Sequence, residues 1–258
     1  MIRKIQTYLQ FLLKSTNQHG VHSPFVFNFV TKCLYKKQER KKYSVFVKNK
    51  KQLLNNLEII EVQDFGAGSK VFKSNQRRIR DIAKIAGISN KRGELLIKTA
   101  SYFNAHHILE IGSSLGISTV ALALADKKSN IITIEGCKNT AKIAQRQFKQ
   151  LNLDHIQLYT EPIEHCLEKI VTENVFDLIF FDGNHTKEAT LNYFHTCLNS
   201  IHNESIFIFD DIYWSNEMRD CWEEIKKHPK VTVTIDTYKW GLIFFRKEQA
   251  KEHFTIRV

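Results

Sequence analysis

The chain has few of the residues that interrupt or crosslink a fold. Its 258 residues include only 3 prolines and 10 glycines, so no linker or low-complexity segment divides it. The five cysteines form an odd, scattered set without a C-x-x-C pair, which argues against a disulfide framework and against a zinc site. No apolar run reaches the roughly 18 residues of a membrane span, and the first apolar stretch is too short for a secretory signal. We therefore expect a cytoplasmic protein with no transmembrane segment.

Acidic residues are scarce in the first part of the chain. Residues 1–106 hold 21 Lys and Arg against 6 Asp and Glu, whereas the remainder holds 17 against 21. A basic segment of this kind can bind nucleic acid or another anionic partner. A lysine-rich solvated surface is the favoured explanation, because the basic residues are not interleaved with aromatic ones. Nucleic acid stays a possible partner that is not favoured, and a homodimer is also open.

From residue 107 onward, short apolar runs alternate with helix-like segments. The runs that we predict as strands cover 107–111, 131–135, 155–160, 176–182, 205–210, 231–236 and 241–246. The segments between them that we predict as helices cover 115–126, 138–150, 162–172, 187–200 and 216–227. This alternation is typical of a parallel sheet with helices on both faces. The last two runs are too close for a crossover helix, so the last strand must run antiparallel.

The predicted fold is therefore an α/β, Rossmann-like, seven-stranded, mostly parallel sheet with an antiparallel last strand and a helical N-terminal extension. We expect the extension over residues 1–88 and the alternating domain over residues 89–258. Before the sheet, we expect helices at 2–14, 24–37, 76–86 and 91–103. The stretch 57–70 is loop-like, with a short strand as the alternative.

Two glycines follow the first strand of the alternating domain, in ILEIGSSLGIST (108–119). Gly112 and Gly116 stand where a strand gives way to a helix, so a ligand can approach backbone N–H groups there. Their G-x-x-x-G spacing matches neither the dinucleotide fingerprint nor a phosphate loop. The next strand ends on Glu135, which is well placed to accept hydrogen bonds from two ribose hydroxyls. The two features together predict a site for a ribose-containing cofactor.

These motifs, with FDLIFFDGNH and IFIFDDIYW further on, resemble the class I S-adenosylmethionine-dependent methyltransferases. Within that class they are similar to the catechol-type and macrolide-type O-methyltransferases, over about residues 89–246. The resemblance implies a methyltransferase domain over 89–258, S-adenosyl-L-methionine as the cofactor and an N-terminal extension that acts as a lid. It places Glu110, Gly112 and Ser118 around the methionine portion, Glu135 on the ribose and Glu161 near the adenine. The full expected cofactor set is Glu110, Gly112, Ser113, Ser114, Gly116, Ser118, Glu135, Glu161 and Asp182.

Three aspartates follow two successive strands. Asp182 ends one strand, Asp210 ends the next, and Asp211 lies beside it, so all three are expected at one edge of the sheet. Such a cluster needs a cation, and all-oxygen ligands favour Mg²⁺, Mn²⁺ or Ca²⁺ over zinc. By resemblance, three Asp are the macrolide-type pattern. The sequence thus predicts a metal site; the alternative is that these residues merely end strands and cap a turn.

A divalent cation would lower the pKa of a substrate hydroxyl and orient it. A base must then take the proton, and His185, three residues after Asp182, is the candidate. The alternative is that His185 caps the following helix. We also expect Tyr213, Trp214 and Trp240 on the same rim, where they could stack on a flat substrate.

The favoured hypothesis is metal-assisted O-methylation of a small hydroxylated substrate. A second hypothesis is a metal-independent methyltransferase acting on RNA or another anionic substrate, as the basic first segment suggests. A third is a non-catalytic cofactor-binding protein that serves in interactions.

Overall fold

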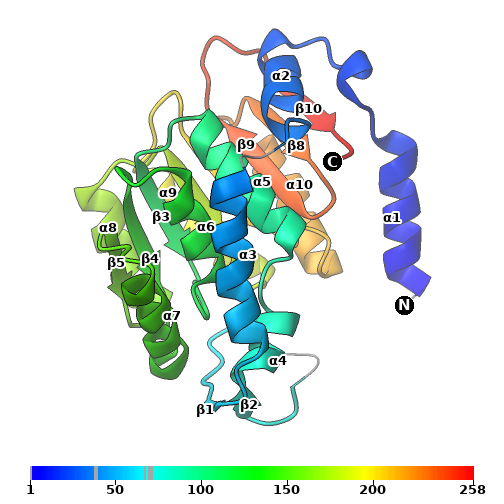
Figure 1. Ribbon diagram of the computed structural model, residues 1–258. Helices are drawn as coiled ribbons and strands as arrows, with labels where there is room; N and C mark the ends of the chain where they lie inside the picture. Colours follow the sequence, from blue (N-terminus) through cyan, green and yellow to red (C-terminus); the bar gives the residue numbers. More distant parts are fainter. Residues whose placement is uncertain (1, 38–39, 67, 69–71) are drawn as a thin grey trace.

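An eight-stranded sheet forms the centre of the computed structural model, which describes residues 2–37, 40–66, 68 and 72–258 (Figure 1). The strand order is β10-β8-β9-β7-β6-β3-β4-β5. All neighbours are parallel except at β9, which runs antiparallel to both β7 and β8. The strands are β3 (His107–Ile111), β4 (Asn130–Ile134), β5 (Ile156–Tyr159), β6 (Leu178–Phe181), β7 (Ile206–Asp210), β8 (Val233–Asp236), β9 (Trp240–Phe244) and β10 (Glu252–Thr255).

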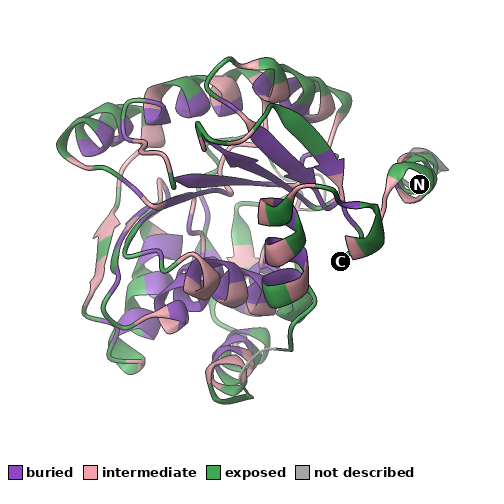
Figure 2. Ribbon diagram, turned by 90° about the horizontal axis from the view of Figure 1, so that it is seen from above, coloured by how far each residue is buried: buried purple, intermediate pink, exposed green. Residues whose placement is uncertain are grey.

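Helices cover both faces of this sheet, as Figure 2 shows from above. One face packs against α8 (Ile163–Glu173), α9 (Lys187–Cys197) and α10 (Asn216–Lys227). The other packs against α5 (Asn90–Tyr102), α6 (Ile117–Ala125) and α7 (Lys138–Gln150). The central strands are apolar throughout because both faces are buried. In β6, Leu178 and Phe180 enter one core and Ile179 and Phe181 the other.

The segment before the sheet is mainly helical and shares the core of the α5–α7 face. It contains α1 (Ile2–Lys14), the 3₁₀ turn η1 (Gln18–Gly20), α2 (Pro24–Phe29), the π-helical turn η2 (Val30–Leu34), α3 (Arg40–Leu54) and α4 (Ile79–Ile85). Between α3 and α4, β1 (Ile59–Glu61) and β2 (Gln76–Arg78) form a small antiparallel pair. No helix in the described ranges is long and apolar enough to cross a membrane.

The structure confirms the mostly parallel sheet, the helices on both faces and the antiparallel β9, but the count of seven strands is wrong. β10 adds an eighth strand, parallel to β8 at the edge of the sheet. Its residues Glu252 and His253 are exposed and only Phe254 and then Ile256 are buried, so its apolar signal is short. Edge strands bury few side chains, which is why this one lacks a hydrophobic run.

α3 is the second element that we did not predict. Its buried positions are Phe46, Asn49, Lys50 and Leu53, which have the i, i+3, i+4, i+7 spacing of a helix face. Two of the four are polar, and each has a partner. Asn49 Nδ2 donates to Gln147, and Lys50 Nζ donates to the Ile88 carbonyl. A hydrophobic pattern therefore cannot reveal this helix.

The topology fixes where a ligand can bind. β3 lies between β6 and β4, and the chain runs from it to β4 and β5 before returning to β6 on its other side. In such open sheets the connections diverge at this switch point and leave a crevice outside the carboxyl ends of the strands. The turns after β3, β4, β6 and β7 all reach that edge.

Candidate active site

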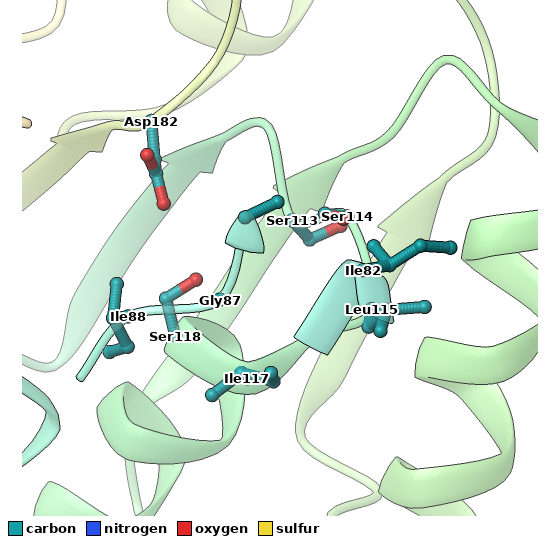
Figure 3. A pocket seen from close by; sticks show the side chains of 10 residues that line it. Ile82, Gly87, Ile88, Ser113, Ser114, Leu115, Ile117, Ser118 and Asp182 are labelled. Atoms are coloured by element: carbon teal, nitrogen blue, oxygen red, sulfur yellow. The ribbon is translucent and has the colours of Figure 1, made fainter. Parts of the chain in front are cut away.

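A cleft of about 290 Å³ opens at the carboxyl edge of the sheet. Its walls include the turns after β3, β4, β6 and β7, the first turn of α5, residues 62–66, Gly68 and Phe72. From the expected cofactor set, the cleft includes Gly112, Ser114, Glu135 and Asp182. A small cavity beside it adds Ser113 and Ser118. Across this cavity the Asp182 side chain points towards Ser118 (Figure 3).

The turn after β3 is tight because it contacts the turn after β6. Gly112 has φ +90°, and a Cβ there would lie 2.7 Å from Gly183 Cα. Its N–H and that of Ser113 donate to the Ile134 carbonyl, at 3.0 and 3.2 Å. Glycine is required here by both the backbone conformation and the close approach.

Gly116 begins α6 with φ +77°, but it is not among the residues that line either cavity. A Cβ at this position would meet Phe148 and Ala144 of α7 within 3 Å. This glycine therefore lets α6 and α7 pack closely. The strand-to-helix motif thus combines a cavity-lining glycine, Gly112, with a packing glycine.

Glu135 follows β4, and three nearby groups donate hydrogen bonds to its carboxylate. Its Oε2 accepts the Ser114 N–H at 2.6 Å, and its Oε1 accepts the Cys137 N–H at 2.8 Å and the Thr140 hydroxyl at 3.1 Å. Burial raises the pKa of Glu135, and these hydrogen bonds oppose that rise. The carboxylate is thereby fixed in the wall of the cleft.

Besides Gly116, two residues of the expected cofactor set, Glu110 and Glu161, do not line the cleft or the cavity beside it. Glu110 is fully buried in β3, where its Oε2 accepts hydrogen bonds from the hydroxyls of Thr119 and Thr133. Burial raises its pKa, and hydroxyl hydrogen bonds oppose the rise. Glu161 immediately precedes Pro162, which lines the cleft, but Glu161 itself does not line it. Glu110 supports the turn from behind rather than forming its surface.

The remaining residues fit S-adenosylmethionine. The Ser113 Oγ is buried and has no hydrogen-bond partner among the described residues. A ligand that donates or accepts a hydrogen bond there would satisfy it. Gly112 leaves space for a ligand against the backbone, and Glu135 offers carboxylate oxygens at the next strand. Ser113, Ser118 and Asp182 would hold the methionine end, and Glu135 the ribose.

The acidic residues gather where β6 and β7 end. In their parallel register Phe181 pairs with Phe209, so Asp182 lies level with Asp210, next to Asp211. The cation beside them is Arg92, in the first turn of α5. Its Nη1 lies 2.5 and 2.6 Å from the two carboxylate oxygens of Asp210.

Each of the three carboxylates has a basic side chain of the protein within 4 Å. Arg92 pairs with Asp210, Lys239 Nζ lies 3.8 Å from Asp211 Oδ1, and His185 Nε2 lies 3.7 Å from Asp182 Oδ1. Burial and the charge of Asp210 raise the pKa of Asp182 well above its usual range, while Arg92 lowers it. The same two causes raise the pKa of Asp211. The raised pKa values favour the neutral forms of Asp182 and Asp211, and Asp210 is paired with a guanidinium.

This arrangement does not fit the divalent metal that we expected from the three aspartates. No group of three His, Cys, Asp or Glu side chains in the described part of the chain is placed to hold a metal ion. A divalent ion about 4 Å from the Arg92 guanidinium would be repelled by about 8 kcal/mol at an effective dielectric constant of about 20. The aspartates do converge, but an arginine already neutralises them.

His185 lines the cleft and does not cap the helix that follows it. The cap of α9 is Thr186, whose hydroxyl accepts the Ala189 N–H. Of the aromatic residues expected on the rim, Trp214 lines the cleft, 6.4 Å from His185 between ring centroids. Trp240 is buried against Phe180 instead.

The sequence did not reveal Arg92 or the cover over the cleft. Nothing in the sequence distinguished Arg92 from the many other basic residues of the first segment. The cover comes from the stretch after β1. A Cβ on Gly136 would lie 2.7 Å from the Phe65 ring, and one on Gly66 would lie 2.8 Å from Asn184 Cα. This stretch therefore rests on the turns after β4 and β6.

Comparisons with known proteins agree with this geometry. Residues 109–212 match a family described as a methyltransferase domain. The chain is 28% identical over 137 residues to a catechol O-methyltransferase of Niastella koreensis, an alignment that covers 52% of this chain and 61% of that protein. The chain thus spans about three fifths of the length of that curated relative.

Solved structures share the fold. A methyltransferase of Podospora anserina bound to S-adenosylhomocysteine has a TM-score of 0.61 and 18% identity, covering 88% of this chain and 97% of that one. An O-methyltransferase of tomaymycin synthesis from Streptomyces achromogenes, in complex with S-adenosylmethionine, has a TM-score of 0.59 and 16% identity, covering 90% and 99%. Fold, site geometry and the methyltransferase-domain match over residues 109–212 agree with one another. The chain is similar to the catechol O-methyltransferases.

Proposed function

We propose that this protein transfers the methyl group of S-adenosylmethionine to a hydroxyl oxygen of a small molecule. The observation that carries the proposal is the cleft itself, whose wall includes Gly112, Ser114 and Glu135 together with Asp182 and His185. A cofactor-binding wall and a group able to accept a proton thus face the same space. The catechol O-methyltransferase relative supports oxygen as the acceptor atom.

The charge of the cleft supports a neutral or cationic substrate. Besides the two arginines Arg77 and Arg92, its wall holds the carboxylates of Asp64, Glu135, Glu164, Asp182, Asp210 and Asp211. Arg77 is already paired with Asp64, at 2.8 Å. An anionic chain such as RNA would be repelled by this wall, so the basic first segment does not make the cleft a nucleic-acid site.

The reaction needs an electrophilic methyl group, which S-adenosylmethionine supplies on a positively charged sulfur. In the proposed step the substrate hydroxyl gives its proton to His185 Nε2. Its oxygen forms the new bond to carbon, and the electron pair of the broken carbon–sulfur bond stays on sulfur. Asp182 Oδ1 lies 3.7 Å from that nitrogen and helps to hold the ring in the cleft.

The N-terminal extension completes the cleft as a lid in this proposal. Phe65 packs over Gly136 beside Glu135, and Phe72 lines the same cleft under the Arg77 guanidinium, which lies 4.7 Å from the ring centroid. Both rings cover the place where the nucleoside part of the cofactor would lie. Excluding water there strengthens the interactions of the charged groups inside.

Calorimetry and a methyl-transfer assay test the proposal. We expect the protein to bind S-adenosylmethionine and S-adenosylhomocysteine, and to methylate oxygen atoms within a panel of catechols and sugar hydroxyls, with products identified by mass spectrometry. An Asp182→Asn variant, which loses the carboxylate beside His185, should retain the fold and lose most of the turnover. Binding without any turnover would support a non-catalytic cofactor-binding protein, and no cofactor binding would contradict the proposal altogether.

A further inference from the structure

Arg92 stands at a position where a cation is not expected for reasons of helix stability. It lies in the first turn of α5, after the cap residue Ser89, whose hydroxyl accepts the Arg92 N–H at 3.2 Å. The start of a helix carries a partial positive charge and favours anions, so a buried guanidinium there is unfavourable by itself. The carboxylate of Asp210 is what compensates for it.

The Arg92 guanidinium lies within 4 Å of two of the three aspartates. Nη1 reaches both oxygens of Asp210, and it lies 3.9 Å from Asp211 Oδ1. The charge of Arg92 also acts on the carboxyl of Asp182. The single positive charge of Arg92 therefore interacts with all three carboxylates.

The same guanidinium has donors to spare. Nη1 makes all of its carboxylate contacts within the described part of the chain, which leaves the N–H groups on Nε and Nη2. The side chain is 21% exposed and lines the cleft together with His185 and Trp214. A substrate oxygen near His185 would also lie near these free donors.

We propose that Arg92 is a built-in cation that replaces a divalent metal ion at the Asp182, Asp210 and Asp211 cluster and donates hydrogen bonds to the substrate hydroxyl oxygen. This inference rests on the proposed function for its second half only. The guanidinium stabilises the negative charge that develops on that oxygen while the proton moves to His185. Arginine keeps its charge throughout the pH range of enzymes, so this contribution does not depend on pH or on metal supply.

Manganese binding tests the replacement without any need for a substrate. The electron paramagnetic resonance signal of free Mn²⁺ is followed as protein is added, for the wild type, Arg92→Met, Asp210→Asn, the double variant Arg92→Met/Asp210→Asn and Arg77→Met. Arg77 is the matched control, because it lines the same cleft and pairs with Asp64. Circular dichroism and calorimetric binding of S-adenosylmethionine establish that each variant is folded.

We expect Arg92→Met to bind one Mn²⁺ about tenfold or more tightly than the wild type, since it removes the repelling charge and leaves the carboxylates. The double variant and Arg77→Met should bind no better than the wild type. Tight binding of one Mn²⁺ by the wild type, lost in Asp210→Asn, would overturn the proposal. So would a folded Arg92→Met that gains no affinity. If Arg92→Met does not fold, the wild-type and Asp210→Asn titrations still decide.

The role toward the substrate is tested with the hydroxyl that the wild type methylates. Turnover should be unchanged by a chelator, and Arg92→Lys, which keeps the charge but loses the forked donors, should lower kcat about tenfold with little change in cofactor affinity. Loss of turnover on chelation would overturn this role. Failure to find any methylated substrate, by contrast, bears on the proposed function and leaves the manganese result standing.

Discussion

The two ends of the cleft hold their carboxylates in different ways. At the cofactor end, Glu135 is held by N–H and hydroxyl groups from the adjoining turns, the most distant being that of Ser114. At the reaction end, Asp210 is held by Arg92, from a helix 118 positions earlier in the chain. The first arrangement is made by turns that the strands themselves fix. The second exists only when α5 has packed against the sheet.

This difference has a consequence for what each end tolerates. A backbone donor cannot be mutated away, so the cofactor end is vulnerable mainly where the turn itself is changed. The reaction end consists of side chains that can be exchanged singly, and each exchange leaves a buried charge without its partner. Variants should therefore damage folding at the first end and chemistry at the second.

The largest effect is expected at the reaction end, from His185→Gln. Removing a positioned general base typically lowers turnover by about 10²- to 10³-fold, and glutamine keeps a similar size and polarity. KM for both substrates should change little, since the role proposed for His185 is toward the reacting proton rather than the cofactor. Steady-state kinetics would measure this.

His165→Gln is the control for that variant, because this histidine is exposed on α8 away from the cleft lining. It should behave like the wild type. Equal turnover in His185→Gln and the wild type would mean that another group takes the proton.

At the cofactor end, Gly112→Ala should mainly destabilise the fold. Alanine would have to adopt φ +90° and would place its Cβ 2.7 Å from Gly183 Cα, with backbone on both sides. We expect the free energy of unfolding to fall by about 3 kcal/mol, from conformation and overlap together. Denaturant unfolding would measure this.

Gly68→Ala separates these two causes. Gly68 has φ +70°, but no described atom lies within 4 Å of an added Cβ. Its loss should be about 1 kcal/mol, from the backbone conformation alone. Equal losses at the two positions would show that the contact between the turns after β3 and β6 contributes nothing.

The same contrast explains what the sequence could predict. The helices at 138–150 and 216–227 have the bounds expected from their patterns, and the strands of the sheet agree within a few residues. Gly112 and Glu135 were found because their geometry depends on a strand, a turn and the residues next to them. Such local features can be read from a short stretch of sequence.

Arg92, α3 and β10 could not be found in this way. The role of Arg92 depends on Asp210, which lies on a strand distant in the sequence. The buried polar residues of α3 have partners, Gln147 and the Ile88 carbonyl, that lie on other elements. The expectation of a metal ion arose for the same reason, because a short stretch of sequence does not show which distant side chains lie beside it. Three aspartates predict a cation, but the sequence does not tell whether a metal ion or a side chain supplies it.

A smaller effect is expected from Glu135→Gln. The carboxylate accepts two backbone N–H groups, and an amide would turn its own N–H₂ group towards one of them. If Glu135 also binds the ribose, the Kd for S-adenosylmethionine should rise by about 10- to 30-fold, equivalent to about 1.4 to 2 kcal/mol. Calorimetry would measure it, with Glu168→Gln, exposed on α8, as the control. Unchanged affinity would remove Glu135 from the proposed ribose site.

The smallest effect is a difference in pH dependence at Glu110, behind the cofactor turn. Burial raises the pKa of this carboxyl above its usual value, so the folded protein holds the proton more tightly than the unfolded chain does. The resulting stability is fully present below the unfolded pKa and is lost as the pH rises through the folded pKa.

Glu110→Gln removes this titration. Between pH 4.5 and the folded pKa, the unfolding free energy of the wild type should therefore fall relative to that of the variant, by at most about 1.4 kcal/mol per pH unit. Denaturant unfolding at a series of pH values measures the difference directly. Parallel curves would mean that Glu110 is equally ionised in both states, and that the Thr119 and Thr133 hydrogen bonds offset the cost of burial in full. The two ends of the cleft would then differ only in the groups that donate hydrogen bonds to their carboxylates.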